Sequence, residues 1–263
     1  MISPNAIHFS ALVVAYNEDH LIKDCLKSLS FCEDIILIDL GSKDNTVEIA
    51  KSFKAKIVTH PWVPIGEQAK NFGLQFTKND WVIVVDPDER VSPSLIPQIR
   101  NAIQSDFDLG IVYVPWKFYF LGEKLTSTRW GYVGKIKGLA IHKSRVTFGT
   151  LVNSPYFLKT GFSQKKIPFK DDNELSHLWV TDIKSFIKKH WKYIKMEGEA
   201  QYIKGNQFSF NKLLFDPWRH LKINLINYRG LTDGWRGIFL SFFMAWFAFM
   251  NELSLWNYSR KIK

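Results

Sequence analysis

Within residues 1–90, short apolar runs alternate with amphipathic stretches. Four apolar runs have the length and the β-rich composition of buried strands: 9–15, 35–40, 56–60 and 81–85. Three stretches between them space their apolar residues as a helix does: 19–29, 44–53 and 65–76. Because strand and helix alternate, the pattern predicts an α/β fold with a mostly parallel sheet and helices on both faces.

The pattern changes after residue 90. We expect one helix and two strands in the next part of the chain: 93–103, 110–115 and 139–142. A strong amphipathic helix follows at 181–204, with Thr181 as its expected N-cap. Pro217 is expected to interrupt the next helical region, and a turn at 230–234 precedes a final aromatic helix.

Composition adds size, charge and redox state to this outline. The chain has 263 residues, of which 46% are hydrophobic, enough for one large domain or for a domain with an appendage. Its net charge of +10 favours anionic partners such as nucleotides or a membrane surface. Cys25 and Cys32 belong to no metal-type cluster, and the first residues lack a secretory signal, so we expect reduced thiols and a cytoplasmic protein. The apolar stretch 237–250 is shorter than the ~20 residues of a confident bilayer span.

The run 81–85 ends in two aspartates, Asp86 and Asp88, with Pro87 between them. In an open α/β sheet, ligands bind just beyond the carboxyl ends of the strands. Two carboxylates at such a place suit a hard divalent cation that also binds phosphate oxygens. The alternative interpretation is an acidic turn, since Asp-Pro is common in turns.

The ends of the two earlier strands are also polar. Tyr16, Asn17 and Glu18 follow the first run, and Asp39 lies near the end of the second. A carboxylate at a strand end can accept hydrogen bonds from ribose hydroxyls or from a base, and Lys70 can place a cation on a diphosphate. The alternatives are helix capping for Asn17 and a solvated surface position for Lys70. Neither a Rossmann G-x-G-x-x-G motif nor a G-x-x-x-x-G-K-[ST] phosphate loop is present in the sequence.

Four short motifs follow one another along this half of the chain: VAYNE at 14–18, DLGSKDNT at 39–46, AKNFG at 69–73 and DPDER at 86–90. In this order and spacing they resemble the family-2 glycosyltransferases with the GT-A fold. More narrowly, they resemble the bacterial branch that includes lipopolysaccharide-core glucosyltransferases. Weaker similarity continues at FLG (120–122), LSH (175–177) and LTDG (231–234).

The resemblance implies a domain organisation and a reaction. A GT-A domain would occupy 1–180, with a nucleotide-binding half at about 1–90 and an acceptor half at about 91–180, and a helical extension rich in aromatic and basic residues would occupy 181–263. The reaction would use a nucleotide-sugar donor and a divalent cation, Mg²⁺ or Mn²⁺, and would invert the anomeric carbon. Such a cation stabilises the charge that builds on the departing diphosphate.

The resemblance also assigns roles by position. Six residues would bind the nucleotide sugar: Tyr16, Asn17, Glu18, Asp39, Lys70 and Asp86. Within that set, Lys70 would approach the diphosphate, and Asp86 would lie near the ribose and the metal. The metal ligands would be Asp86, Asp88 and His177, although a histidine in such a position is more often a packed structural residue.

An inverting transfer benefits from a base that deprotonates the acceptor hydroxyl. Relatives in this branch carry a His-Glu pair near residue 152, where this chain has Asn153 and Ser154. Asparagine cannot accept that proton at neutral pH. Asp172 and Glu174 are the other candidates for the base, and an exposed acidic loop is the competing interpretation of both.

The last third of the chain interleaves Trp and Tyr with Lys and Arg. Aromatic rings settle at the level of lipid headgroups, and cations meet anionic lipids. We therefore expect 235–256 to lie in the plane of a membrane interface, with an ordinary core helix as the alternative. The protein would be peripheral on the inner face of the cytoplasmic membrane. Its acceptor would be a saccharide or a lipid-linked saccharide of cell-envelope glycan synthesis.

Three other classes of protein share some of these features. A sugar nucleotidyltransferase needs a Gly-rich, arginine-bearing loop after its first strand, and residues 16–18 do not form one. A nucleic-acid-binding module would use the positive charge but would leave the four motifs without a purpose, so we expect no nucleic-acid partner. A degenerate homologue that binds nucleotide without transferring sugar stays open because of Asn153 and Ser154.

Overall fold

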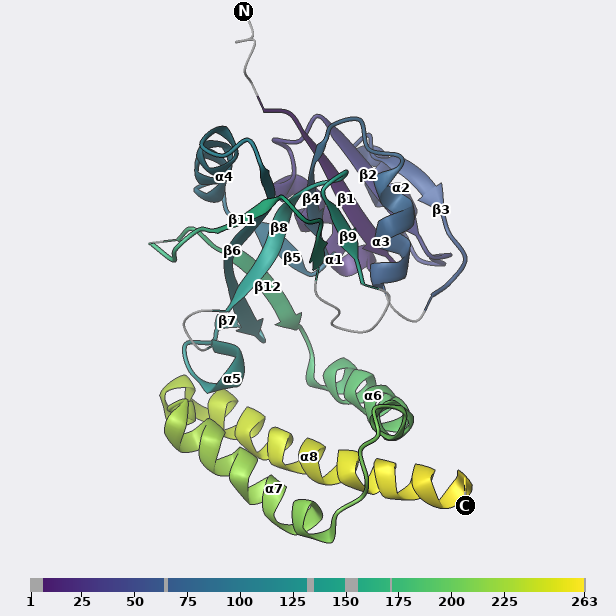
Figure 1. Cartoon of the computed structure of the whole chain (residues 1–263), viewed down its shortest axis with the longest axis vertical. Helices are drawn as coiled ribbons and strands as arrows, with labels where there is room; N and C mark the ends of the chain where they lie inside the picture. Colours follow the sequence, from purple (N-terminus) through teal and green to yellow (C-terminus); the bar gives the residue numbers. More distant parts are fainter. Residues whose placement is uncertain (1–6, 64–65, 132–134, 150–155, 171, 263) are drawn as a thin grey trace, which may run out of the picture. The chain divides into compact units, whose positions relative to one another are not determined.

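The computed structural model describes five stretches of the chain: 7–63, 66–131, 135–149, 156–170 and 172–262. By its internal contacts the chain divides into two compact units, which are described separately here (Figure 1). The sheet unit comprises Met1–Trp116 and Ile136–His177. The helical unit comprises Lys117–Lys135 and Leu178–Lys263, so it includes a segment from the middle of the chain.

The sheet unit is built on four parallel strands in the order β3–β2–β1–β4. Their bounds are Phe9–Ala15 for β1, Asp34–Asp39 for β2, Lys56–Thr59 for β3 and Trp81–Val85 for β4. Beyond β4 the pairing becomes antiparallel, because β8 (Ile136–His142) runs against both β4 and β6 (Leu109–Phe120). The carboxyl ends of β1, β2 and β4 therefore lie at one edge of the sheet.

The remaining strands extend or flank this sheet. β12 (Leu175–Val180) pairs antiparallel with β5 (Glu89–Val91), which places His177 opposite Glu89. Four short strands complete the set: β7 (Glu123–Lys124), β9 (Val146–Phe148), β10 (Tyr156–Leu158) and β11 (Ser163–Lys166). The β12–β5 pairing matters for function, because it joins a late segment of the chain to the turn that follows β4.

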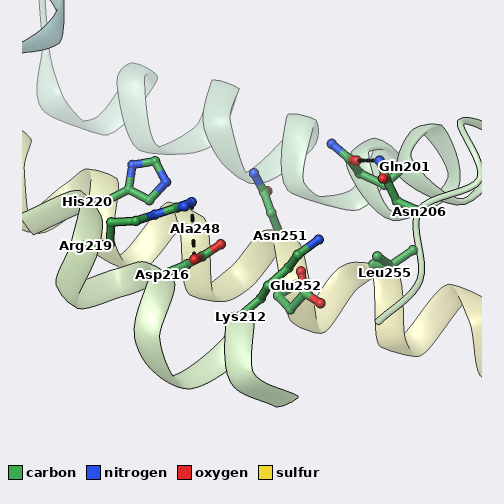
Figure 2. A pocket seen from close by; sticks show the side chains of 10 residues that line it. All are labelled: Gln201, Asn206, Lys212, Asp216, Arg219, His220, Ala248, Asn251, Glu252 and Leu255. Carbon is green, nitrogen blue, oxygen red and sulfur yellow. Dashed lines mark hydrogen bonds and ion pairs between the residues drawn. The ribbon is translucent and has the colours of Figure 1, made fainter. Parts of the chain in front are cut away.

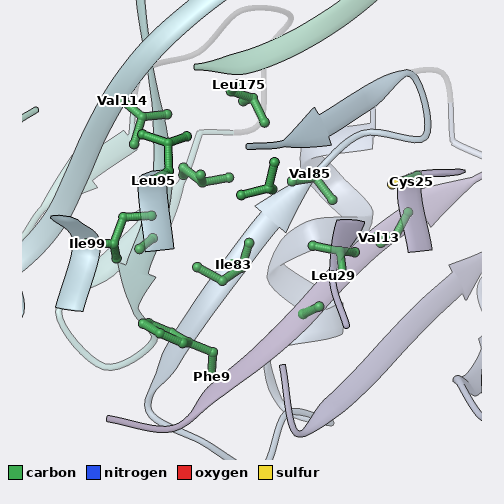
Figure 3. Close-up of a cluster of buried hydrophobic side chains, with 14 of the residues drawn as sticks. Phe9, Val13, Cys25, Leu29, Ile83, Val85, Leu95, Ile99, Val114 and Leu175 are labelled. Atoms are coloured by element: carbon green, nitrogen blue, oxygen red, sulfur yellow. The ribbon is translucent and has the colours of Figure 1, made fainter. Parts of the chain in front are cut away.

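Successive residues of β1 point to opposite faces of the sheet, and each face has its own core. One core, shown in Figure 3, packs Phe9 and Val13 against α1 (Asp19–Ser28) and α4 (Leu95–Gln104). The other core packs Leu12 and Val14 against α3 (Gly66–Leu74) and β9. α2 (Thr46–Ser52) packs beside α1. The prediction of a sheet with helices on both faces is therefore confirmed.

In the part of the helical unit that the structure describes there are one short helix and three long ones: α5 (Thr128–Gly131), α6 (Ile183–Ile203), α7 (Phe210–Lys222) and α8 (Gly234–Ile262). A π-helical turn at Ile223–Asn227 and a 3-10 turn at Gly230–Asp233 link α7 to α8. α8 packs against both α6 and α7. At Gly198 of α6, a Cβ atom would lie 2.4 Å from the carbonyl oxygen of Ser254, so glycine permits the close approach of α6 and α8.

Two expectations about these helices are wrong. The N-cap of α6 is Asp182 and not Thr181, and its carboxylate accepts a hydrogen bond from the amide of Ser185 at 2.8 Å. The helix starts one residue later than expected, which leaves Thr181 outside it. α7 continues through Pro217. A proline removes one backbone hydrogen bond, and packing along α8 offsets that loss.

Among the described residues, one helical stretch, Gly230–Ile262, is long and apolar enough by length and composition to cross a membrane. Four of its large side chains are buried in the helical unit: Leu240, Phe243, Met244 and Leu255. Seven others are exposed: Leu231, Trp235, Ile238, Phe242, Phe249, Trp256 and Ile262. The segment 235–256 therefore contributes side chains both to the core of the helical unit and to its surface. Its place at a membrane interface stays a prediction.

His190 of α6 packs among five aromatic rings: Trp179, Phe186, Tyr193, Phe243 and Phe247. Burial lowers the pKa of His190. The neutral side chain therefore contributes stability above the ordinary histidine pKa of about 6.5. That stability is lost as the pH falls below about 6.5, because the histidine of the unfolded chain then binds a proton more readily than His190 of the folded protein does.

We expect the melting temperature, followed by circular dichroism, to be lower at about pH 5.5 than at about pH 7.5. The decrease should be smaller in the His190→Phe variant, which has no imidazole to protonate. Some decrease should persist in the variant, because burial also lowers the pKa of His220. An equal decrease in wild type and variant would show that His190 does not contribute.

Candidate functional site

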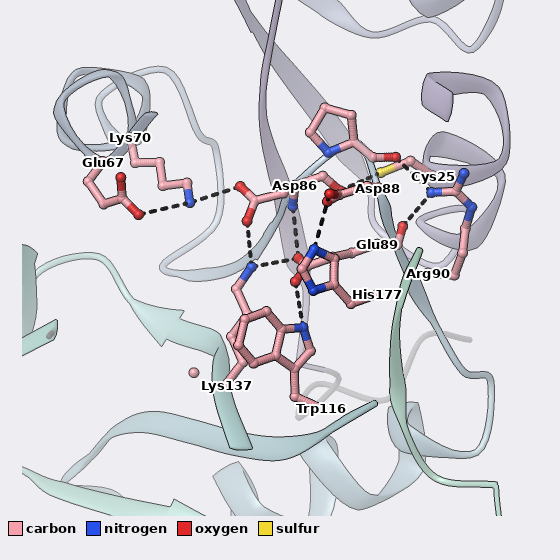
Figure 4. A network of polar contacts seen from close by, with 12 residues as sticks. Cys25, Glu67, Lys70, Asp86, Asp88, Glu89, Arg90, Trp116, Lys137 and His177 are labelled. Atoms are coloured by element: carbon pink, nitrogen blue, oxygen red, sulfur yellow. Dashed lines mark hydrogen bonds and ion pairs between the residues drawn. The ribbon is translucent and has the colours of Figure 1, made fainter. Parts of the chain in front are cut away.

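The turn after β4 is held by backbone and side-chain hydrogen bonds (Figure 4). The amide of Glu89 donates to the carbonyl of Asp86 at 2.9 Å. The Arg90 guanidinium donates to the carbonyls of Pro87 and Glu89, at 2.7 and 2.8 Å, and to that of Leu21 in α1 at 2.7 Å. The DPDER motif therefore builds its own turn and ties it to α1, which sets the directions of both aspartates.

The carboxylate of Asp86 lies between two ammonium groups. Lys70 of α3 approaches one oxygen at 2.9 Å, and Lys137 of β8 approaches the other at 2.7 Å. Burial disfavours the ionised carboxyl, but the two cations outweigh it and hold the pKa of Asp86 well below its usual range. The Asp86 side chain keeps 38% of its surface exposed. Two cations and a carboxylate thus border an accessible surface at the carboxyl edge of the sheet.

Glu89 is a member of this network to which the sequence assigned no role. Its side chain is fully buried. One oxygen accepts hydrogen bonds from the Lys137 ammonium at 2.6 Å and from the amide of Asp86 at 2.9 Å. The other accepts from the indole N–H of Trp116 at 2.9 Å. Burial raises the pKa of Glu89. Burial opposes the charge on Lys137, but Asp86 and Glu89 outweigh it and raise the pKa of Lys137 well above its ordinary value.

Asp88 meets His177 from the neighbouring strand. The Nε2 atom of His177 lies 3.1 Å from a carboxylate oxygen of Asp88. The imidazole stacks on the indole of Trp116, with ring centroids 5.0 Å apart and planes 9° from parallel. Trp116 therefore orients two side chains: its indole face stacks on His177, and its indole N–H donates to Glu89. Two of the three predicted metal ligands are adjacent in the structure.

Within the described ranges, no group of three or more His, Cys, Asp or Glu side chains is arranged to hold a metal ion. Where a magnesium ion works on phosphates, one or two carboxylates usually bind it and the phosphate oxygens complete its shell. The Asp88–His177 pair has suitable donor atoms for such a partial site. Each oxygen of Asp86 already has an ammonium partner, so a cation bound there would share the carboxylate with Lys70 and Lys137.

The loops after β1 and β2 are hydrogen-bonded to each other. The amide of Asn17 donates to the hydroxyl of Ser42 at 3.0 Å, and its side-chain oxygen accepts from the amide of Lys43 at 2.7 Å. The amide of Glu18 donates to the hydroxyl of Thr46 at 2.7 Å. Asn17 therefore bridges the two loops instead of capping a helix, and the two motifs form one joined edge.

Asp39 is buried at the end of β2. Its carboxylate accepts hydrogen bonds from the amides of Gly41 and Ser42, at 3.2 and 3.0 Å. Gly41 has a φ of 88°, in the left-handed region that favours glycine, so the turn depends on this residue. Tyr16 is exposed on the loop after β1. Four of the six residues expected to bind the nucleotide sugar, Tyr16, Asn17, Glu18 and Asp39, therefore lie in or beside two loops that are hydrogen-bonded to each other.

Three residues of the AKNFG motif have separate roles in α3. Lys70 is buried and paired with Asp86, so its interpretation as a solvated surface residue is wrong. The side-chain amide of Asn71 donates to the carbonyl of Phe148 and accepts from its N–H, both at 3.0 Å. A Cβ atom on Gly73 would lie 2.5 Å from the Leu12 side chain. Asn71 and Gly73 hold α3 close to β9 and β1, and this position directs Lys70 to Asp86.

The two candidate bases lie in different surroundings. Asp172 is exposed, and its backbone carbonyl accepts a hydrogen bond from the Ser94 hydroxyl at 3.1 Å. Glu174 is buried, and its carboxylate accepts from the Ser176 hydroxyl at 3.3 Å. Asn153 and Ser154, which stand where relatives carry the His-Glu pair, lie outside the described residues. The role of base therefore stays a prediction for Asp172 and Glu174.

Two cavities lie away from the predicted residues. One of about 480 Å³ in the sheet unit is lined by Trp81, His142 and their neighbours, at the amino end of β4. The other, of about 290 Å³, lies in the helical unit between α6, α7 and α8 (Figure 2). Neither is lined by a residue that the sequence predicted to bind donor or metal. The candidate site is instead the edge where β1, β2 and β4 end.

Comparisons with known proteins agree with the motifs. The model of glycosyl transferase family 2 matches residues 10–170. An uncharacterized glycosyltransferase of Rickettsia typhi is 34% identical over 261 residues, which cover 96% of this chain and 88% of that protein. The lipopolysaccharide core biosynthesis glycosyltransferase LpsC of Rhizobium meliloti is 22% identical over 79% of this chain and 77% of LpsC. A third relative, from Rickettsia bellii, is 36% identical, but the match spans only 33% of its length.

Two solved structures to which the chain is similar each match it over less than half its length. Staphylococcus aureus TarS (residues 1–349) is 20% identical with a TM-score of 0.39, covering 43% of this chain and 36% of that one. Glucosyl-3-phosphoglycerate synthase from Mycobacterium tuberculosis, solved with Mn²⁺ and uridine diphosphate, is 23% identical with a TM-score of 0.36. That match covers 44% of this chain and 45% of the synthase.

Proposed function

Because this chain belongs to glycosyl transferase family 2, we propose that it moves a sugar from a nucleotide-sugar donor to a saccharide or lipid-linked saccharide acceptor, with a divalent cation and with inversion at the anomeric carbon. The observation that carries the proposal is the convergence at the carboxyl edge of the sheet. Lys70 and Lys137 flank Asp86 there, and Asp88 of the same turn contacts His177 of β12. Ligands of open α/β sheets bind at this edge.

The side chains at this edge match the parts of a sugar nucleotide. In this proposal Asp39 and the joined loops of Asn17 and Glu18 would bind the nucleoside, and their hydrogen bonds to one another support the assignment. Lys70 would meet the diphosphate. Asp88 and His177 would hold Mg²⁺ or Mn²⁺, with Asp86 beside them. When bound, the cation acts as a Lewis acid that stabilises the negative charge of the departing nucleoside diphosphate.

Lys137 extends this assignment beyond the residues that the sequence identified. Its ammonium group is bound by both Asp86 and Glu89 and remains protonated. A diphosphate that approaches Asp86 therefore meets two fixed cations, Lys70 and Lys137, instead of one. Preorganised charges of this kind stabilise a transition state without reorganisation at the moment of reaction.

The acceptor side of the proposal depends on a base and on a location. Asp172 and Glu174 are the candidates for deprotonating the acceptor hydroxyl. We place the reaction in the cytoplasm, at the inner face of the cytoplasmic membrane, in the synthesis of cell-envelope glycans. The similarity to LpsC supports this choice of pathway class. A degenerate homologue that binds nucleotide but transfers no sugar is the second candidate, because Asn153 and Ser154 replace the expected pair.

A donor screen by thermal shift, with Mn²⁺ present, tests the proposal. A ligand at 100 times its dissociation constant stabilises the native state by about 2.7 kcal/mol, so one sugar nucleotide should raise the melting temperature above the others. Sugar transfer from that donor to an acceptor distinguishes the enzyme from a degenerate homologue. Absence of a shift with every sugar nucleotide tested would contradict donor binding.

A further inference from the structure

The outward face of α7 carries large apolar side chains. Four of them are exposed, by between 46% for Leu214 and 71% for Trp218: Phe210, Leu214, Phe215 and Trp218. None of the described residues of α7 is buried. At about 100° of rotation per residue, the four lie on one side of the helix. We call them the α7 face. Contiguous apolar surface of this kind is rare on a soluble protein unless it binds something.

Cations border the α7 face. Lys212, Arg219 and Lys222 are exposed on the same helix. Lys212 and Arg219 also line the polar cavity shared with α8 (Figure 2). Protein–protein interfaces are depleted in lysine, whereas helices that lie in a membrane interface combine Trp, Phe and Leu with Lys and Arg. The composition of this surface therefore fits lipid better than a second protein.

Positive charge is segregated in the same unit of the chain. The helical unit has 18 Lys and Arg residues against 7 Asp and Glu, a net charge of +11. The sheet unit has 17 against 18, a net charge of −1. The whole excess of +10 thus belongs to the unit that carries the α7 face. An anionic surface is the partner that complements this distribution.

We propose that the α7 face docks on an anionic lipid bilayer, with its four apolar side chains in the interface and the three bordering cations at the level of the lipid phosphates. α8 supports α7 from within, because its buried residues pack inside the helical unit. The docking rests on the proposed function in one respect: a lipid-linked acceptor would be presented at the surface where the protein sits. Binding to the bilayer does not itself require sugar transfer.

Flotation of the full chain with lipid vesicles tests this docking. Wild type should float with vesicles that contain phosphatidylglycerol and should remain in the dense fraction when the vesicles contain phosphatidylcholine alone. The double variant Phe215→Glu/Trp218→Glu should bind at least about tenfold more weakly, because two large side chains leave the apolar region. Lys212→Glu/Lys222→Glu should weaken binding about fivefold for each cation removed. Phe107→Glu is the matched control, since Phe107 is 89% exposed in the sheet unit, and it should bind as wild type does.

Four results would overturn the docking. In the first, wild type does not float with vesicles that contain phosphatidylglycerol, and in the second, the Phe215→Glu/Trp218→Glu variant floats as well as wild type. In the third, wild type sediments as a dimer and this variant as a monomer. In the fourth, wild type stays bound to the vesicles during alkaline extraction. The third makes a second copy the occupant of the face, and the fourth makes α8 a membrane span. The donor thermal shift is measured on the same proteins. Flotation without any shift would count against the proposed function alone, whereas a shift without flotation would count against docking alone.

Discussion

Replacing Asp88 by alanine is expected to lower kcat/KM for sugar transfer by a factor on the order of 10³, because the cation supplies several kcal/mol of charge stabilisation and loses its carboxylate ligand. Asp88 is the better aspartate to replace. Its carboxylate contacts His177, whereas the carboxylate of Asp86 balances the positive charges of two lysines. Removing Asp86 would leave Lys70 and Lys137 facing each other and would mix a loss of stability with a loss of activity. The measurement is initial rate against donor concentration with Mn²⁺ supplied.

Asp80→Ala is the matched control for this change. Asp80 precedes β4, whereas Asp88 follows it, so the two carboxylates lie beyond opposite ends of the same strand. Asp80 lies 3.6 Å from Lys143 and is largely exposed, so its loss should leave transfer unchanged. Full turnover by Asp88→Ala, together with full turnover by any folded Asp86→Ala protein, would refute metal-assisted transfer at this turn.

The Lys137→Met variant is expected to lose about 3 kcal/mol of unfolding free energy, measured by denaturant titration. The substitution leaves the buried carboxylate of Glu89 without its ammonium partner. Breaking a buried ion pair from one side costs about 3–5 kcal/mol, and the lower end applies here because Asp86 is partly exposed and keeps Lys70. The same variant should lose donor affinity, because one of the two cations at the candidate diphosphate site is gone.

Lys143→Met provides the control for Lys137. Lys143 follows directly after β8, but it donates to backbone carbonyls of Thr77 and Lys78 and pairs only loosely with Asp80. Its replacement should change stability by less than about 1 kcal/mol. Adding Glu89→Gln to Lys137→Met should restore part of the lost stability, since it neutralises the unpaired charge. A double variant no more stable than the single one would show that the Lys137–Glu89 pair is not the cause.

Periodicity predicted the elements of the sheet unit well. The runs 9–15 and 81–85 coincide with β1 and β4, because alternating and continuous apolar patterns depend only on neighbouring residues. Cys25 and Cys32, expected to be reduced because they belong to no metal-type cluster, are both free in the structure. Together with the family match, the parallel strands, the flanking helices and the helical C-terminal segment confirm the α/β fold class expected from the motifs.

Local reasoning failed where packing competed with it. Pro217 reads as a helix breaker, but α7 packs along α8 and continues. A lysine on a helix is usually a surface residue, but the close approach of Gly73 to β1 brings Lys70 within ion-pair distance of Asp86. Asn17 reads as a cap, but the neighbouring loop gives its side chain another partner. In each case a contact distant in sequence outweighed a local preference.

Over residues 9–88, the sequence by itself determined the order of strands and helices and the carboxyl edge at which polar residues collect. It also identified Asp39, Lys70, Asp86 and Asp88 as candidates, because each belongs to a motif within one segment. Only the tertiary structure decided that Lys137, Glu89 and Trp116 belong to the site. Their contacts join residues 51, 48 and 27 positions apart, for Lys137 with Asp86, Lys137 with Glu89 and Trp116 with Glu89. Such pairs follow from the register of β8, β6 and β5, and register is set by packing between strands rather than by the residues of any one of them.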